Sequence, residues 1–99
     1  MRVSAEAREI IRRTTVEVFG PAARVRVFGS RADDAARGGD LDLLVELPEA
    51  ATDRERKIVT LVARLQLRLG DQPIDVLVVD PATRRQPVHD EALRTGVPL

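Results

Sequence analysis

The apolar and polar positions along the chain alternate between helical and strand spacing. From Ser4 to Phe19 apolar residues recur three or four positions apart with charges between them, which predicts a helix capped by Ser4 and ended by Gly20-Pro21. Residues 24–28 alternate with period two and predict a strand with one buried face. This strand runs directly into Gly29-Ser30, and residues 31–37 are expected to form a short helix.

A second strand is expected over residues 40–47, after the turn at Gly38-Gly39. Side chains of a strand alternate between its two faces, so one face carries only aliphatic residues: Leu41, Leu43, Val45 and Leu47. The opposite face carries Asp40 and Asp42, followed by Leu44 and Glu46.

The remainder of the chain predicts helix, strand and helix. Thr52-Asp53-Arg54-Glu55 matches a capping box, and apolar residues follow at helical spacing until Gly70. Residues 73–79 form the most apolar run and predict a third strand. Pro87 in a first turn and Gly96 as C-cap predict a final short helix. This order favours an α/β (α+β) fold, a small mixed sheet of about three or four strands covered by helices, in a single domain spanning residues 1–99.

Composition limits the classes of function. Acidic and basic residues balance at 16 each, so the chain lacks the positive field typical of proteins that hold nucleic acid by its phosphates. It has no cysteine, which excludes disulfides and thiolate metal sites. Charged residues interrupt every apolar run, and no signal-like segment is seen, so we expect a cytoplasmic protein that neither spans a membrane nor binds nucleic acid directly.

Gly29-Ser30 lies where a strand passes into a helix. Glycine permits close backbone approach to a ligand, and free N–H groups at a helix start attract phosphate. By itself the dipeptide is weak evidence for a phosphate site, because Gly-Ser is common in ordinary turns. Arg31 offers paired donors to phosphate, or serves as a surface residue.

Three aspartates form the candidate catalytic and metal-binding set. Asp40 and Asp42 share one face of a strand, where two like charges favour a hard divalent cation such as Mg²⁺, although a solvated strand start is the simpler alternative. Asp75 interrupts the most apolar strand, where an unpaired carboxylate is costly. It either joins the other two carboxylates or protects an edge strand from aggregation.

The combination of Val27-Phe28-Gly29-Ser30-Arg31-Ala32, Gly39-Asp40-Leu41-Asp42-Leu43-Leu44-Val45 and Ile74-Asp75-Val76 resembles the minimal nucleotidyltransferases. These belong to the DNA polymerase β-like nucleotidyltransferase superfamily. The resemblance implies that Gly29, Ser30 and Arg31 contact the nucleotide phosphates. It also implies that Asp40, Asp42 and Asp75 bind Mg²⁺ and form the catalytic carboxylate triad. The chain departs from the family pattern between Ser30 and Asp40, which is about one residue shorter than usual and carries Asp33-Asp34 and Gly39 at atypical positions.

Further expectations come from the family alone. The resemblance implies transfer of AMP from ATP to a protein acceptor. The expected acceptor is a HEPN-domain toxin partner in a hetero-oligomer, for which this chain would be the antitoxin. The alternatives are a non-catalytic antitoxin that acts by steric occlusion and a metal-dependent phosphohydrolase. His89, the only histidine, is expected to be an ordinary surface residue rather than a general base.

Overall fold

A mixed sheet in the order β3-β2-β1-β4 forms the centre of the molecule. In this computed structural model, which describes residues 1–33 and 39–99, the strands are β1 (Arg24–Phe28), β2 (Leu41–Glu46), β3 (Ile74–Val79) and β4 (Val97–Pro98). β1 runs antiparallel to β2 and β4, whereas β2 and β3 are parallel. The predicted fold class and the mixed sheet are therefore confirmed.

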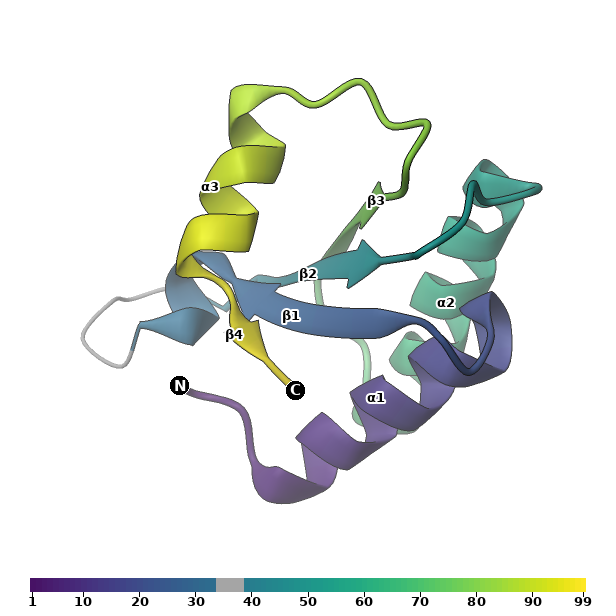
Figure 1. Cartoon of the computed structure of the whole chain (residues 1–99). Coiled ribbons are helices and arrows are strands. Elements are labelled where there is room, and N and C mark those ends of the chain that lie inside the picture. The colour runs from purple at the N-terminus through teal and green to yellow at the C-terminus, as the bar shows by residue number, and fades with distance from the viewer. Residues whose placement is uncertain (34–38) are drawn as a thin grey trace.

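Helices cover both faces of the sheet. α1 (Ala5–Phe19) and α2 (Arg54–Leu69) pack on one face, and α3 (Pro87–Thr95) lies on the other (Figure 1). The larger apolar cluster lies beneath α1 and α2 and includes Ile11, Leu43, Val45, Leu61 and Leu65. A smaller cluster beneath α3 joins Leu44, Val79 and Ala92. The face of β2 that carries Leu44 is therefore the face that α3 partly covers.

α1 begins and ends as the sequence predicts. The Ser4 hydroxyl accepts a hydrogen bond from the Ala7 N–H (3.1 Å), which caps the first turn. Gly20 ends the helix at φ +102°, a conformation that favours glycine. The final helix also matches its prediction, with Pro87 in its first turn and Gly96 as its C-cap.

The predicted helix over residues 31–37 is wrong in its position. A short 3₁₀ turn, η1 (Gly29–Ala32), begins directly after β1 and ends before Asp33, which is extended. The turn begins early because Gly29 adopts φ +70°, which reverses the chain at the end of the strand. Residues 34–37 of the predicted helix lie outside the described residues.

The predicted capping box at the start of α2 is also wrong. Asp53 rather than Thr52 is the N-cap, and its left-handed backbone (φ 50°, ψ 41°) carries no side-chain capping bond. The Thr52 hydroxyl instead accepts a hydrogen bond from Lys57 Nζ (3.4 Å). The capping geometry needs an extended cap residue, so the left-handed backbone of Asp53 excludes it.

β4 was not identified individually from the sequence. It pairs Val97 with Val27 and Pro98 with Arg26, and the Leu99 N–H extends the pairing to the Val25 carbonyl (3.0 Å). Two residues are too few to show a period in the sequence, and only the adjacent β1 makes them a strand.

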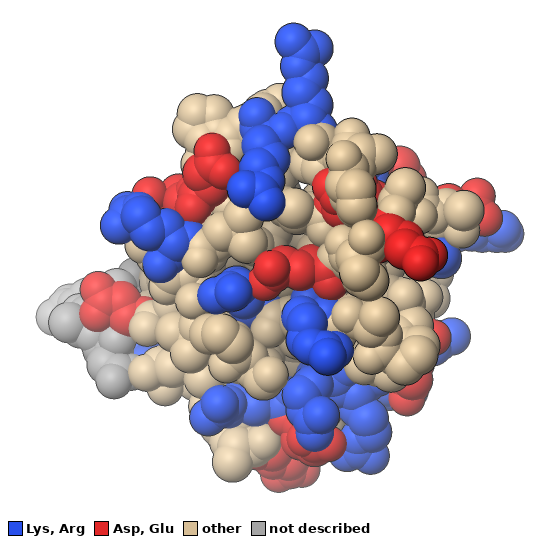
Figure 2. Space-filling model, in the orientation of Figure 1, with Lys and Arg blue, Asp and Glu red and all other residues tan. Residues whose placement is uncertain are grey.

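Charged side chains of both signs are interspersed over the face that carries α3 and β4 (Figure 2). Among the described residues no helix is both long and apolar enough to cross a bilayer.

Candidate active site

The ends of three strands meet at one end of the sheet. Because β1 is antiparallel to β2, the last residue of β1, Phe28, pairs with Asp42 near the start of β2. Because β2 and β3 are parallel, Asp42 in turn pairs with Asp75 near the start of β3. Gly29, which follows Phe28, therefore lies beside a row of two aspartates that crosses the sheet.

Asp42 and Asp75 project from the same face. Their neighbours Leu41, Leu43, Ile74 and Val76 belong to the cluster beneath α1 and α2, so the aspartates point to the side of α3. Adjacent strands are about 4.8 Å apart, which brings register partners on one face close together. Leu44 and Leu77, two residues further along each strand, pack in the cluster beneath α3.

The Asp42 carboxyl is half-buried, and its pKa lies above the ordinary value of 3.8. Burial is the largest cause, followed by the negative charges of Asp75 and then Asp40. A carboxylate in this setting is stabilised by a proton or a bound cation.

Asp40 occupies a more peripheral position. It precedes β2 and is exposed, although its charge still acts on Asp42. Within residues 1–33 and 39–99 no group of three or more His, Asp or Glu side chains has the geometry to hold a metal ion. The structure thus pairs Asp42 with Asp75 through the sheet register and leaves Asp40 outside the strand.

The Asp42 carboxylate occupies the space that a side chain at Gly29 would need. A Cβ atom at Gly29 would lie 2.3 Å from Asp42 Oδ2, far inside van der Waals contact. The backbone at Gly29 also has φ +70°, which side chains rarely adopt. Glycine is therefore required here for two independent reasons, and one of them is the position of the carboxylate.

Arg31 links the turn after β1 to the segments that precede β2 and β3. Its Nη2 donates to the Gly39 carbonyl (2.8 Å) and to Gln72 Oε1 (2.9 Å). The first contact holds the residue before Asp40, and the second reaches the segment before β3. The sequence suggested a phosphate contact or a surface role for Arg31, and neither suggestion included these bonds.

Gln72 connects Arg31 to α2 and was missed by the sequence analysis. Its backbone N–H donates to Gln66 Oε1 (2.8 Å), and Gln66 Nε2 donates back to the Gln72 carbonyl (2.5 Å). The Leu41 N–H donates to the Pro73 carbonyl (3.0 Å), which ties the starts of β2 and β3 together. A loop glutamine has no pattern in the sequence that reveals such a role.

Ser30 lies half-buried in the turn next to Gly29. Its carbonyl accepts hydrogen bonds from the Asp33 N–H (3.3 Å) and from Arg2 Nη2 (3.0 Å). These bonds hold the turn against the N-terminal segment and leave the Ser30 side chain outside the bracing network.

Two other ionisable groups have structural roles. His89 Nδ1 accepts a hydrogen bond from the Gln86 N–H (3.0 Å) at the start of α3. The buried Asp80 carboxylate accepts hydrogen bonds from the Ala51 and Ala82 N–H groups and the Thr83 hydroxyl. These hydrogen bonds hold the pKa of Asp80 below its ordinary value, and the bond from the Ala51 N–H has the largest effect. The dipeptide Asp80-Pro81 is typical of a turn, and this was the one sequence feature that pointed to the structural role of Asp80.

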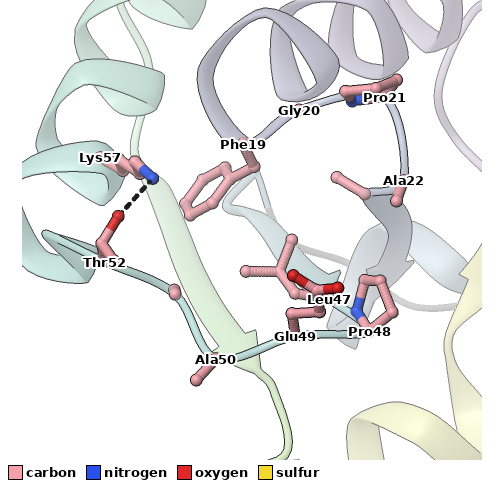
Figure 3. Close-up of a pocket in the computed structure, with 12 residues that line it drawn as sticks. Phe19, Gly20, Pro21, Ala22, Leu47, Pro48, Glu49, Ala50, Thr52 and Lys57 are labelled. Carbon is pink, nitrogen blue, oxygen red and sulfur yellow. Dashed lines mark hydrogen bonds between the residues drawn. The ribbon is translucent and has the colours of Figure 1, made fainter.

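A pocket of about 290 Å³ lies at the opposite end of the sheet (Figure 3). Phe19, Gly20 and Pro21 face Leu47 and Pro48 across it, and Lys57 stands at its side. Leu47 is five residues along the chain from Asp42, or about 16 Å at the usual strand rise. This pocket is therefore separate from the aspartates.

Residues 8–95 match a known protein family described as nucleotidyltransferase domain. The chain belongs to the nucleotidyltransferase domain family. No curated protein matches it significantly. Enzymes with this domain transfer nucleotidyl groups and generally use Mg²⁺ and nucleoside triphosphates. The family match includes the Gly29 turn and both strands that carry Asp42 and Asp75.

Proposed function

We propose that this nucleotidyltransferase domain transfers AMP from ATP to a protein acceptor. The observation that carries the proposal is the row formed by Phe28, Asp42 and Asp75 across three strands, with Gly29 against the Asp42 carboxylate. Family membership supports nucleotidyl transfer as the class of reaction.

The residues present fit a divalent cation. Carboxylate oxygens are the ligands that Mg²⁺ prefers, and the pKa of Asp42 is raised first by burial and then by the negative charges of Asp75 and Asp40. Asp42 and Asp75 would be the principal ligands, and Asp40, which lies outside β2 and forms no three-carboxylate group with them in this structure, would complete the set that the sequence predicts. Because Gly29 has no side chain, the Asp42 carboxylate can keep its position beside the turn. Bound Mg²⁺ would neutralise charge on the triphosphate and on the departing pyrophosphate.

The protein contributes alignment and proton transfer. On this proposal the N–H groups of the Gly29-Ser30 turn bind phosphate oxygens beside Asp42. An acceptor hydroxyl oxygen bonds to the α-phosphorus as the bond from that phosphorus to the pyrophosphate oxygen breaks. Asp75 accepts the hydroxyl proton, for which an exposed carboxylate at the rim is suited.

The proposed acceptor is a HEPN-domain toxin, with this chain as its antitoxin. A balanced charge of 16 acidic and 16 basic residues supports a protein acceptor over nucleic acid. The proposed setting is the cytoplasm, in a hetero-oligomer of the two proteins.

The test is transfer of label from α-³²P-ATP in Mg²⁺ to the protein encoded beside this chain, which on this proposal is a HEPN-domain protein. We expect label in the acceptor and release of pyrophosphate, and we expect no label from γ-³²P-ATP. Asp42→Asn should abolish transfer, whereas Asp53→Asn, a matched change of an exposed aspartate at the start of α2, should not. Phosphate release without an acceptor would indicate a phosphohydrolase instead.

A non-catalytic antitoxin is the second candidate. It is favoured by the atypical residues between Ser30 and Asp40, of which the acidic Asp33 is exposed beside the turn. On this alternative the toxin is neutralised equally by the wild type and by Asp42→Asn, and no label is transferred.

A further inference from the structure

β3 leaves one edge of the sheet open. The strand order places β2 on one side of β3, and no strand among the described residues lies on the other. β3 is six residues long and wholly extended. An open edge of this length is a template for pairing with another chain.

The backbone groups that face outward can be assigned. The Pro73 carbonyl accepts from the Leu41 N–H, and the Val79 carbonyl accepts from the Leu47 N–H, so odd-numbered residues of β3 bond to β2. Because the strand alternates, the N–H and C=O groups of Ile74, Val76 and Val78 point away from the sheet. In the described parts of the chain nothing hydrogen-bonds to these groups.

A groove of about 350 Å³ follows this edge. Residues 76–78 of β3 contribute to its lining, and the start of α2 forms one wall through Arg54, Glu55 and Ile58. The segment leading into α3 forms the other wall, with Thr83, Arg84, Gln86 and His89. The edge is therefore accessible along a channel rather than covered by its neighbours.

The charge of the groove favours an acidic occupant. Arg54 lies 3.8 Å from Glu55, a long ion pair in which the Arg54 side chain is half-buried and the Glu55 side chain is largely exposed. Arg84 is exposed and forms no ion pair with the residues that the structure describes. The lining thus carries two arginines against one glutamate, and one of these arginines is left for a ligand.

We propose that the open edge of β3 binds an extended, acidic segment of a protein partner as an added antiparallel or parallel strand. Backbone bonds to Val76 and Val78 provide affinity, and Arg84 selects negative charge. The segment's role as acceptor rests on the proposed function: a strand about 4.8 Å away places a hydroxyl side chain on the same face as Asp75. Its docking does not rest on that function.

The direct probe is a fluorescein-labelled synthetic peptide of about ten residues, long enough to cover β3, with alternating glutamate and valine around a central tyrosine. A counterpart with lysine in place of glutamate is the charge control. We expect the acidic peptide to bind at least about tenfold more tightly in fluorescence anisotropy. Amide hydrogen exchange should slow at Val76 and Val78.

Two variants locate the binding. Val76→Pro removes an outward N–H that does not bond to β2. It should weaken binding of the acidic peptide at least about tenfold. Arg84→Glu should weaken it several-fold, whereas Arg8→Glu, the same change on exposed α1 near β4, should have no effect. Thermal unfolding of each variant checks its fold, and the arginine pair keeps the test valid if Val76→Pro fails to fold.

Each result decides the proposal. Absence of binding, equal binding of both peptides, or slowed exchange elsewhere than β3 would overturn it. Self-association of the wild type that Val76→Pro abolishes would identify a second copy as the occupant and also overturn it. A peptide that docks but is never labelled from ATP would leave docking intact and contradict transfer to this acceptor. Labelling of a partner unaffected by Val76→Pro and Arg84→Glu would reject docking and leave the transfer intact.

Discussion

At the scale of single residues, Gly29 and Asp42 act as one unit because the backbone of the first sets the space for the second. Gly29→Ala places a Cβ 2.3 Å from Asp42 Oδ2 and strains the backbone at φ +70°. We expect unfolding free energy to fall by about 1–2 kcal/mol, since the native conformation is unsuited to alanine. Nucleotidyl transfer should fall at least about tenfold, because the displaced carboxylate loses its position.

Gly39→Ala is the matched control for this substitution. Among the described residues a Cβ at Gly39 meets nothing within 4 Å, although Gly39 lies in the same site. Its stability and transfer rate should stay near those of the wild type. Wild-type activity in Gly29→Ala would show that the contact with Asp42 has no part in function.

The ionised Asp42 carboxylate is expected to lower the stability of the fold while being required for transfer. Its folded pKa lies above 3.8, so the native state binds more protons than the unfolded state between 3.8 and the folded value. This carboxyl therefore makes the protein less stable as pH rises through that window. Asp42→Asn should raise the melting temperature at pH 7 in metal-free buffer while abolishing transfer.

Thermal unfolding with and without Mg²⁺ and ATP measures this prediction. The wild type should gain stability when ligand is added, because a ligand that binds only the folded state shifts the equilibrium. Asp42→Asn should not gain stability on ligand addition. A lower melting temperature for the metal-free variant would contradict the destabilisation that burial and the nearby charges of Asp75 and Asp40 are expected to cause at this carboxyl.

At the scale of elements, the site depends on a link between three loops. Arg31 in η1 bonds to the Gly39 carbonyl and to Gln72, and Gln72 bonds to Gln66 at the end of α2. The aspartates lie on two strands whose starts this link holds together. These bonds favour a positioning role for Arg31 that does not require contact with nucleotide.

Gln72→Met separates that role from phosphate binding. It removes one acceptor of Arg31 but keeps the Gln72 backbone bonds to Gln66. If Arg31 acts by positioning, Gln72→Met should lower kcat several-fold. Arg31→Met, which removes both bonds, should lower kcat further. An Arg31→Met variant that only raises KM for ATP, beside an unaffected Gln72→Met, would instead indicate a phosphate contact.

At the scale of the whole molecule, two apolar clusters hold the sheet from opposite sides. Leu43 is buried beneath α1 and α2, and its neighbour Leu44 is buried beneath α3. Leu44→Ala should cost about 2–5 kcal/mol of unfolding free energy, the range for a leucine truncated in a packed interior. Because that cluster attaches α3, amide exchange should accelerate most in α3.

Leu43→Ala is the matched control on the other face. It should cost a similar free energy but accelerate exchange in α1 and α2 rather than α3. Identical exchange changes in the two variants would contradict two separable clusters.

Much of this architecture could be predicted from the sequence, for identifiable reasons. The period-two run at residues 24–28 and the helical run ending at Gly70 are long enough to show their spacing, and both elements are present. The start of α2 could not be predicted, because the left-handed conformation of Asp53 depends on the preceding turn. β4 exists only because β1 is there to pair with it.

The sequence by itself determined which face of each strand is apolar, because side-chain alternation is a local property of the backbone. It also placed Gly29-Ser30 at a strand end and the aspartates on the polar faces. Only the tertiary structure decided that β2 and β3 are parallel neighbours in the register that pairs Asp42 with Asp75. Strand order and register depend on contacts between distant segments, and so do the contact of Gly29 with Asp42 and the open edge of β3.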